Sequence, residues 1–340
     1  MQQKITIALD MMSGDHSVSS SVPAATESLE KFNDLFLILV GNQNEINSLL
    51  SDKIKLLEGL RYRIVHTDEY IKMEDDIIAA IRTKKKSSMR LGINTVKNKE
   101  SDACVSAGNT GALMALSKII LKTIPGIDRP AICGSLPTKT GQFHMLDLGA
   151  NVECDSKHLY QFSIMGSALV QSLELNDKPV IGLMNIGSEE FKGNETIKTA
   201  GKLMHNSNLN YAGYVDGDDI FSGKFDVIVT DGFAGNIALK SIEGVAKVIS
   251  YFIKTEYTKN IFTKISALIS LPVLKSVKNK VDPRKYNGAS LLGLQGIVVK
   301  SHGGADSYAF SQAINTAYYE VKNQLLDKIE SLIQTELSNE

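Results

Sequence analysis

The order of short apolar segments along the chain constrains its fold more than any other sequence feature. Nine segments are rich in aliphatic and β-branched residues, and they are apolar continuously rather than at alternate positions. Such segments are typical of strands in a sheet that helices cover on both faces. The predicted strands are Ile5–Leu9, Leu35–Val40, Tyr62–Val65, Ala103–Ser106, Ala131–Ser135, His144–Leu148, Val180–Met184, Phe225–Thr230 and Gly296–Lys300.

Longer segments with helical periodicity separate these strands. Alternating strands and helices predict an α/β fold of three layers, in which helices cover both faces of a mostly parallel sheet. The clearest helical segments are Met73–Met89, Thr110–Lys122, Lys157–Leu173, Asn194–Met204, Asn236–Ile253 and Ala305–Gln334.

Composition supports one large globular unit. Of the 340 residues, 43% are hydrophobic, which suffices for an extensive core. No Pro- or Ser-rich linker divides the chain, so we predict a single catalytic α/β domain over residues 1–340. Strand signals stop over residues 255–285, where we predict an amphipathic helical excursion from that domain. The net charge of −1 provides no field that would recruit nucleic acid as a partner.

The termini and cysteines indicate a cytoplasmic protein. The N-terminal sequence MQQKITIALD lacks the basic and then apolar pattern of a secretory signal. No segment approaches the roughly 20 apolar residues that span a bilayer. Cys104, Cys133 and Cys154 form no CxxC pair, which fits a reducing compartment and predicts no zinc site.

Glycine and small polar residues follow six of the predicted strands. A glycine corner between a strand and a helix directs backbone N–H groups and the positive end of the helix dipole at one point, which favours an anion such as phosphate. Because ligands of open α/β sheets bind beyond the carboxyl ends of strands, six corners on one sheet predict an anion or cofactor crevice. The corners lie at residues 10–16, 106–111, 147–151, 185–195, 231–236 and 302–306.

No corner carries a standard nucleotide motif. No Gly-Lys-[Ser/Thr] of a Walker A loop follows a strand, and no G-x-G-x-x-G predicts dinucleotide binding. Each corner taken alone is better explained by a tight turn between a strand and a helix. The set of six therefore indicates a site more strongly than any one of its members.

Individual corner residues have both structural and functional interpretations. Lys192 lies in a Gly-flanked acidic turn, where it is either a solvated lysine or a cation that neutralises phosphate. His16 and His302 lie in corners rather than on apolar faces, which favours a functional role. Asp147 ends a strand, and we interpret it as a cap of the following turn. Cys104 lies inside an apolar strand, so we expect a buried inert thiol rather than a reactive nucleophile.

The corners read together carry a family resemblance. The opening corner reads Asp-Met-Met-Ser-Gly-Asp-His and the fourth strand ends in Ser-Ala-Gly-Asn-Thr-Gly-Ala. Further matching segments are Asp147–Asn151, Gln161–Ala168, Lys192–Glu195, Asp219–Lys224 and Asp231–Lys240. With these segments the chain resembles the phosphate acyltransferases of bacterial phospholipid synthesis, the PlsX family, over about residues 5–317. It departs from the family pattern at Met11, Ser13 and Ala234, where the family has Ala, Gly and Thr.

The resemblance implies both a fold and a reaction. The fold would be akin to isocitrate and isopropylmalate dehydrogenases and to phosphotransacetylases, and the protein would be a homodimer. The reaction would transfer a fatty acyl group from acyl carrier protein to inorganic phosphate, giving acyl phosphate for phospholipid synthesis and the free carrier thiol. The resemblance implies no metal and no organic cofactor, and it adds a downstream membrane acyltransferase that uses acyl phosphate as a further partner.

This chemistry needs a positioned phosphate and hydrogen-bond donors at the thioester carbonyl. We predict Lys192 at the phosphate, and Asn236 and His302 at the thioester or the departing thiolate. The predicted substrate-binding residues are Ser13, Gly14, Asp15, His16, Ser106, Gly108, Asn109, Thr110, Gly111 and Asn194.

Three alternatives share parts of this pattern. A short-chain phosphotransacetylase would use coenzyme A in place of carrier protein. A hydroxy-acid dehydrogenase on the same fold would need clustered carboxylates for Mg²⁺ and a set of arginines, which the sequence does not display. A non-enzymatic acyl-binding module would bind the substrate without turnover.

Residues 261–281 carry apolar stripes with flanking cations. Ile261, Ile265, Leu268 and Ile269 recur on one helical face, and the spacing resumes after Pro272. Such a surface suits anionic lipid, an acidic carrier protein or the core of a dimer. We predict peripheral association with the membrane, and the predicted membrane or carrier contacts are Lys264, Leu268, Leu274, Lys275 and Lys278.

Overall fold

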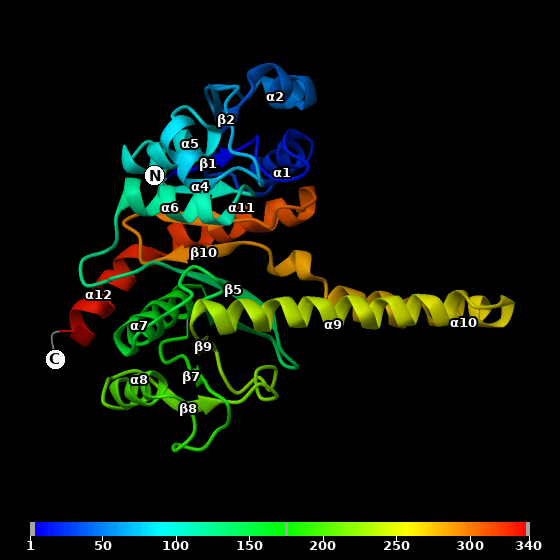
Figure 1. Ribbon diagram of the computed structural model, residues 1–340. Coiled ribbons are helices and arrows are strands. Elements are labelled where there is room, and N and C mark those ends of the chain that lie inside the picture. Colours follow the sequence, from blue (N-terminus) through cyan, green and yellow to red (C-terminus); the bar gives the residue numbers. More distant parts are fainter. Residues whose placement is uncertain (1–3, 174–175, 338–340) are drawn as a thin grey trace.

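Eleven strands form one sheet in the computed structural model, which describes residues 4–173 and 176–337 (Figure 1). Their order across the sheet is β3-β2-β1-β4-β11-β10-β5-β6-β9-β7-β8. Their bounds are β1 (Ile5–Asp10), β2 (Leu35–Gly41), β3 (Tyr62–His66), β4 (Ala103–Ser106), β5 (Ala131–Pro137), β6 (Gln142–Leu146), β7 (Ile181–Met184), β8 (Tyr211–Val215), β9 (Val227–Val229), β10 (Ala289–Leu292) and β11 (Ile297–Lys300).

Helices cover both faces of this sheet, as the continuous apolar strands predict. Along β11, Ile297 and Val299 pack with the first cluster of core residues, and Val298 packs with another on the opposite face. The helices are α1 (Val18–Lys31), α2 (Gln43–Leu49), α3 (Asp52–Lys55), α4 (Ile77–Thr83), α5 (Ser88–Lys97), α6 (Thr110–Leu121), α7 (Ser156–Leu173), α8 (Glu195–His205), α9 (Gly232–Thr258), α10 (Ile261–Lys280), α11 (Ser307–Lys322) and α12 (Leu325–Leu337), with the short 3₁₀ helix η1 (Pro283–Tyr286).

All nine predicted strands are present, and two strands were not predicted. β8 reads Tyr-Ala-Gly-Tyr-Val at the edge of the sheet and is mostly half-exposed, so it lacks a continuous apolar run. β10 has only four residues. β6 begins at Gln142 and ends at Leu146, two residues before the predicted limits at each end.

Strand direction reverses in the middle of the sheet. β11 pairs antiparallel with β10, β10 with β5 and β5 with β6, whereas all other neighbouring strands are parallel. The carboxyl ends of β1, β4 and β11 therefore point to one edge of the sheet, and those of β6, β7 and β9 point to the other. The predicted single crevice of six corners is wrong in this respect, because the corners fall into two sets of three.

Two predicted helices are each split in the structure. Residues 73–89 contain α4 and the start of α5, because residues 84–87 leave the helix and Ser87 precedes a new one. The predicted C-terminal helix is divided into α11 and α12 at Gln324, which has a left-handed φ of 56°.

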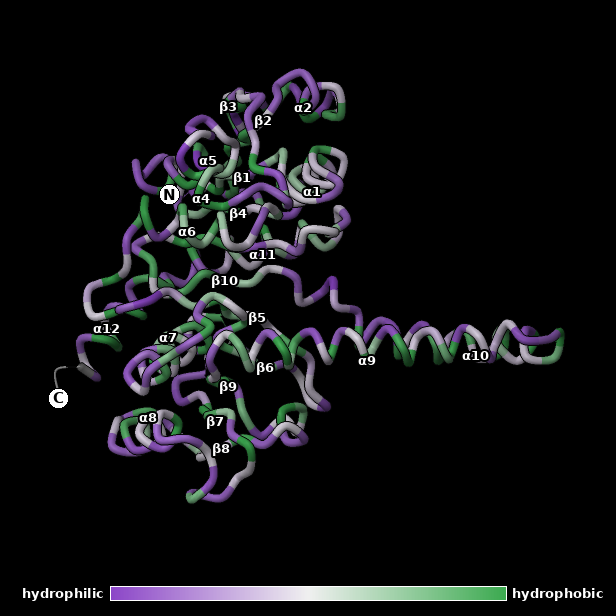
Figure 2. Tube along the Cα trace, viewed as in Figure 1, coloured by the Kyte–Doolittle hydropathy of each residue, from purple (hydrophilic) through white to green (hydrophobic). Residues whose placement is uncertain are grey.

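The predicted excursion is a long helical hairpin. It consists of α9 and α10, joined at Asn260 by a capping box with Thr263, and it projects away from the sheet (Figure 1). In α9 only Gly232 and Gly235 are buried, and α10 buries no residue. Figure 2 shows hydrophilic and hydrophobic residues interspersed along both helices. Over the described residues, none of the helices combines the length and the apolar character needed to cross a membrane.

Candidate active site

The turns that follow β1, β4 and β11 meet in a compact site that we call the buried corner, comprising residues 11–16, 106–109 and 301–305. Asp15 N donates to Gly303 O at 2.8 Å, which joins the first turn to the third. Gly14 has a φ of 78°, and a Cβ there would lie 2.7 Å from Gly303 O and 2.9 Å from the Cβ of Ala107. Only glycine fits this position, because both the backbone conformation and the contacts exclude a side chain.

Side chains hold the turn after β4. Ser106 Oγ donates to Asp10 Oδ2 at 2.6 Å and accepts from Gly108 N at 3.1 Å. Ser13 Oγ accepts from Ala107 N at 2.9 Å. Ser13 therefore contributes a hydroxyl where the family pattern has a glycine, and it binds the turn directly.

Asn109 shapes the entrance to α6. Its Oδ1 accepts from Ala112 N at 3.0 Å as the N-cap, and its Nδ2 donates to Met73 O at 2.8 Å. Thr110 and Gly111 form the first, exposed residues of α6. The start of this helix thus lies beside the buried corner, where its dipole favours an anion.

His302 lies at the exposed side of the buried corner. Its backbone N donates to Asn287 Oδ1 at 2.8 Å, and its ring Nδ1 accepts from Gly304 N at 3.1 Å. Because Nδ1 accepts, the proton of the neutral ring resides on Nε2. The ring is thereby oriented with an N–H available to a ligand. His16 is also exposed at this corner.

Lys300, at the end of β11, is a site residue that the sequence interpretation missed. It is 8% exposed, and its ammonium donates to Ala107 O at 3.2 Å and to Ser301 O. Burial lowers its pKa to about 8, although the charges of Asp10 and Asp15 act in the opposite direction. The signal was available, since a lysine that ends a continuous apolar strand is unusual.

Asn287 was also missed. Its side chain accepts from His302 N and donates to Ser301 Oγ at 2.8 Å and to Ala309 O at 2.7 Å. It therefore fixes the turn after β11 from a neighbouring segment. No local sequence pattern distinguishes such an asparagine from a surface residue.

The second set of corners centres on Asp147, which is fully buried. Its carboxylate accepts from the backbone N–H groups of Ile132, Ala150 and Asn151. The predicted capping role is confirmed, and burial nevertheless raises the pKa of Asp147. Asn236, in the first turn of α9, is exposed and lies against this corner. A Cβ placed on Gly149 would be 3.5 Å from the Cβ of Asn236.

Lys192 lies in the loop after β7, residues 185–194, which we call the β7 loop. Its ammonium forms an ion pair of 2.9 Å with Glu189, and its side chain is 37% exposed. Asn185 Nδ2 donates to Lys192 O at 3.2 Å. Asn194 caps α8 by accepting from Ile197 N at 2.9 Å.

The structure therefore brings together part of the predicted site. Ser13, Gly14, Asp15, Ser106, Gly108 and His302 share the buried corner. Lys192 and Asn194 lie on the β7 loop, and Asn236 lies at the Asp147 corner. One apolar cluster links these regions, because Met114 of α6 and Leu239 of α9 both pack against it.

Cys104 is fully buried, as predicted from its place in an apolar strand. Burial raises the pKa of its thiol, and the nearby Asp10 charge adds to this effect. A thiol with a raised pKa remains protonated and is a poor nucleophile.

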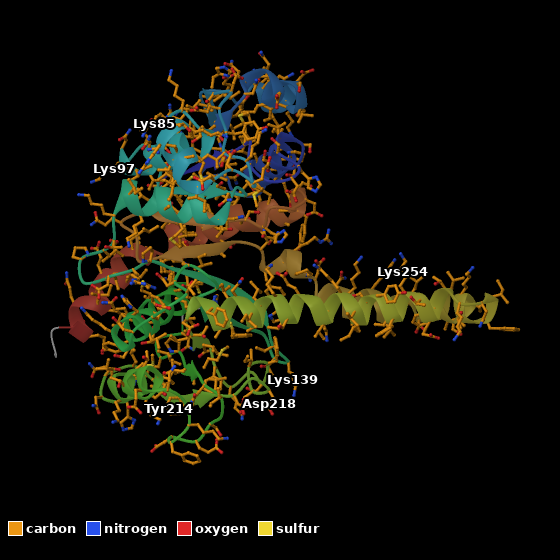
Figure 3. All side chains as sticks on the ribbon, in the orientation of Figure 1. Lys85, Lys97, Lys139, Tyr214, Asp218 and Lys254 are labelled. Carbon is orange, nitrogen blue, oxygen red and sulfur yellow. The ribbon has the colours of Figure 1, made fainter. Side chains whose placement is uncertain are left out.

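The predicted membrane or carrier contacts all lie on α10. Lys264, Leu268, Lys275 and Lys278 are exposed and Leu274 is half-buried. A hollow of about 680 Å³ separates α10 from the β5–β6 connection, and its lining includes Lys139, Lys275, Lys280 and Lys285. Lys139 is labelled in Figure 3, on the connection that reaches toward the hairpin.

Comparisons of sequence relate the chain to one family. The family model described as "Fatty acid synthesis protein" matches residues 5–328. A phosphate acyltransferase of Methylococcus capsulatus is 52% identical over 324 residues, which cover 95% of each chain. A phosphate acyltransferase of Legionella pneumophila (strain Paris) is 51% identical over 332 residues, which cover 97% of each chain.

Comparisons of structure show the fold alone. A phosphotransacetylase from Streptococcus pyogenes superposes with a TM-score of 0.61 at 16% identity, over 94% of each chain. A 4-hydroxythreonine-4-phosphate dehydrogenase from Klebsiella pneumoniae gives a TM-score of 0.52 at 11% identity, over 94% of this chain and all of the other. The chain thus shares its α/β architecture with enzymes of more than one reaction class.

Proposed function

The chain belongs to the fatty acid synthesis protein family, the PlsX family, and we propose on this premise that it transfers a fatty acyl group from acyl carrier protein to inorganic phosphate. The product is an acyl phosphate for phospholipid synthesis. The observation that carries this function is identity of about half, over nearly the full length, to phosphate acyltransferases.

The reaction is a single displacement at the thioester carbonyl. A phosphate oxygen forms the new C–O bond, the C–S bond breaks, and the electron pair leaves with the carrier sulfur. The resulting thiolate takes a proton from solvent or from a positioned acid. Phosphate is already an anion, so the protein must mainly hold it, remove its water and stabilise charge on the carbonyl oxygen.

The buried corner supplies the geometry for holding phosphate. The N–H groups around Ser106–Gly111, the start of α6 and the Ser13 turn lie together there. We assign phosphate to this corner, with Ser13–His16 and Asn109 beside it. Lys192 and Asn194 of the β7 loop lie in the other set of corners, and their contact with phosphate stays a prediction from the sequence that the Lys192→Ala variant tests. In the structure the ammonium of Lys192 pairs with the exposed Glu189.

His302, in the buried corner, and Asn236, in the other set of corners, are each proposed from the sequence to act at the thioester. The Nε2–H of His302 can donate to the carbonyl oxygen or to the departing sulfur, because Nδ1 is occupied by Gly304 N. Asn236 offers an exposed amide beside the Asp147 corner. Both are neutral donors, which suits an oxygen that becomes negative during attack.

The alternatives differ from this function in the acyl carrier, in the reaction catalysed or in turnover. Likeness to phosphotransacetylases and to a dehydrogenase at 16% identity or less concerns the fold, and it does not select their substrates. The test measures release of carrier thiol from acyl carrier protein and from acyl-coenzyme A, with and without phosphate. Phosphate-dependent release with the carrier protein is expected; preference for the coenzyme would favour a phosphotransacetylase, and no turnover would favour a binding module.

The helical hairpin is proposed to mediate dimerisation and association with the membrane. Its exposed apolar side chains, among them Ile261, Phe262, Leu268 and Ile269, need a cover, and lipid and a second copy of the chain are the two covers proposed. We propose a cytoplasmic homodimer that associates peripherally with the membrane. An amphipathic acyl phosphate would then pass readily to a membrane acyltransferase that consumes it.

Two measurements test these proposals. Sedimentation velocity of the wild type is expected to give the mass of a dimer. Anionic vesicles are expected to float the wild type, and a Leu268→Glu, Leu274→Glu double variant is expected to remain in solution. A double variant that floats equally well would remove the hairpin from membrane binding, and one that becomes monomeric would assign the stripe to the dimer interface.

Acyl carrier protein is proposed to bind at the base of this hairpin. Lys139, Lys275, Lys280 and Lys285 around the hollow form a positive surface, and carrier proteins are acidic as a family. Lys264 and Lys278 extend this surface along α10. Asn287, which holds His302, follows Lys285 by two residues, so a carrier at the hollow would lie beside the buried corner.

A further inference from the structure

The last residues of three adjacent strands form a polar row across the sheet. The register pairs Leu9 with Val105 and Lys300 with Ser106, which places Asp10, Ser106 and Lys300 side by side. Side chains alternate faces along a strand, so these three share the face of Ala8, Cys104 and Val298, which all belong to one apolar cluster. A carboxylate, a hydroxyl and an ammonium therefore lie next to one another across the three strands, beside a buried apolar cluster.

This row is almost entirely removed from solvent. Asp10 is 1% exposed, Ser106 is fully buried and Lys300 is 8% exposed. Burying an ammonium is costly unless the surrounding groups repay its lost hydration. A fold that retains a lysine here, where an apolar residue would continue the strand, points to a role for the charge.

The ammonium of Lys300 lies directly beneath the turn that leads into α6. It donates to Ala107 O, and the neighbouring N–H groups of Ala107 and Gly108 are held by Ser13 and Ser106. Two of the three ammonium protons are used on backbone carbonyls of Ala107 and Ser301. The positive charge thus contacts the turn that leads from β4 into the N-terminus of α6.

We propose that Lys300 is a phosphate-positioning residue, whose buried charge holds the nucleophilic phosphate at the corner between β4 and α6. The inference rests on the proposed function for the identity of the anion. It differs from the assignment of Lys192, because Lys300 is part of the sheet and acts from below the turn. At low effective dielectric, a charge a few ångströms away has a large effect on a bound anion.

A purely structural role predicts different behaviour. If Lys300 only balanced Asp10, its replacement would change stability but leave phosphate affinity unaltered. The two roles are separated by measuring phosphate binding directly in the full-length protein, in the absence of any acyl donor. Calorimetric titration with inorganic phosphate provides this measurement for the wild type, Lys300→Met, Lys300→Arg and the control Lys118→Met, which changes an exposed lysine of α6.

The pH dependence provides a second readout. The charged groups facing Lys300 are Asp10 on β1 and Asp15 in the following turn. Ser106 on β4 and Ala289 on β10 flank it without charge, and α5 and α6 cover this face with apolar residues such as Met89 and Leu113. Because an amine loses its charge above its pKa, phosphate affinity of the wild type is expected to fall above about pH 8, approaching ten-fold per pH unit.

The expected result is a phosphate affinity roughly ten-fold or more weaker in Lys300→Met at pH 7, with Lys118→Met like the wild type. Lys300→Arg is expected to bind phosphate without the fall above pH 8, because a guanidinium stays charged. A folded Lys300→Met with affinity within two-fold of the wild type would overturn the proposal. If Lys300→Met fails to fold, the test is Lys300→Arg: a decrease in its phosphate affinity above pH 8 equal to that of the wild type would overturn the proposal.

Failure of this inference and failure of the proposed function are distinguishable. If phosphate affinity is unchanged by Lys300→Met and the enzyme still releases carrier thiol in the presence of phosphate, only the role of Lys300 is rejected. Binding that depends on Lys300, in a protein without turnover, would reject the acyl-transfer function and retain the anion site.

Discussion

The buried corner and the β7 loop both follow parallel strands, yet they are built in opposite ways. The buried corner is held by polar side chains, and these are bonded to side-chain and backbone atoms that are far apart in sequence. The β7 loop holds Lys192 through Glu189, three residues away, and through the amide of Asn185. The conformation of the first region is fixed by contacts between strands of the sheet, and that of the second by contacts within the loop itself. Changes at the buried side chains of the first region should therefore affect folding and chemistry together, and changes at the second should affect binding selectively.

The largest effect is expected for Gly14→Ala. The substitution forces a left-handed φ on a residue with a side chain, at a cost of roughly 1–2 kcal/mol, and it also places a Cβ against Gly303 O. We expect kcat/KM to fall about 100-fold or more, together with a lower melting temperature. Gly217→Ala is the control, because a Cβ there meets no atom within 4 Å. Normal activity of Gly14→Ala would show that the three turns need not pack as closely as the structure has them.

His302→Ala tests the exposed side of the same corner. Loss of a positioned proton donor typically lowers the rate by about 100-fold. Because a thiolate leaves readily without an acid, we expect kcat to fall by no more than this. The effect should appear in kcat at saturating phosphate and carrier protein, with little change in the melting temperature. His205→Ala, at the exposed end of α8, serves as the control. An unchanged kcat would exclude His302 from the thioester step.

Lys192→Ala tests the β7 loop. Removing a charge-assisted contact costs about 1.5–3 kcal/mol, so the apparent phosphate KM should rise roughly ten-fold or more, while the KM for carrier protein changes less. Stability should be preserved, because the ion pair with Glu189 that is lost is half-exposed. Lys198→Ala, which breaks a similar pair with Glu195 on α8, is the matched control. Equal phosphate KM values in the two variants would remove Lys192 from the phosphate site.

The smallest effect is expected for Cys104→Ala. The thiol is buried and protonated, so direct attack by phosphate does not require it. We expect activity within about two-fold of the wild type, measured on protein of confirmed fold. Complete loss of activity, or mass-spectrometric detection of an acyl group on Cys104, would replace direct attack with a covalent mechanism.

The contrast between the regions also explains which features the sequence predicts. Continuous apolar strands predicted a sheet covered on both faces, and the Ser106–Gly111 and Asp10–His16 motifs predicted the buried corner. Both signals are local in the sequence. The reversal at β10 and β5 depends on the pairing of β10 with β5, two segments that are far apart in the chain, and β10 itself has only four residues. The sequence therefore predicted the corners but not their division into two sets.

Lys300 and Asn287 show the same limit for single residues. Lys300 is informative only once the register places it beside Ser106, and Asn287 only once its amide is seen to hold the His302 turn. By contrast, the cap formed by Asp147 was predictable, since a carboxylate at a strand end followed by glycine commonly accepts from the next turn. Long-range hydrogen bonds are thus the part of the site that the sequence does not reveal.

The most direct test of the account is calorimetric binding of inorganic phosphate to the wild type, Ser106→Ala and Lys192→Ala without an acyl donor. Phosphate is proposed to bind at the buried corner, where Ser106 Oγ accepts from Gly108 N, donates to Asp10 and so fixes the turn. This placement predicts saturable binding in the wild type, weaker binding in Lys192→Ala and weaker binding also in Ser106→Ala of confirmed fold. Wild-type affinity in Ser106→Ala, with binding lost in Lys192→Ala, would contradict the account and place phosphate at the β7 loop.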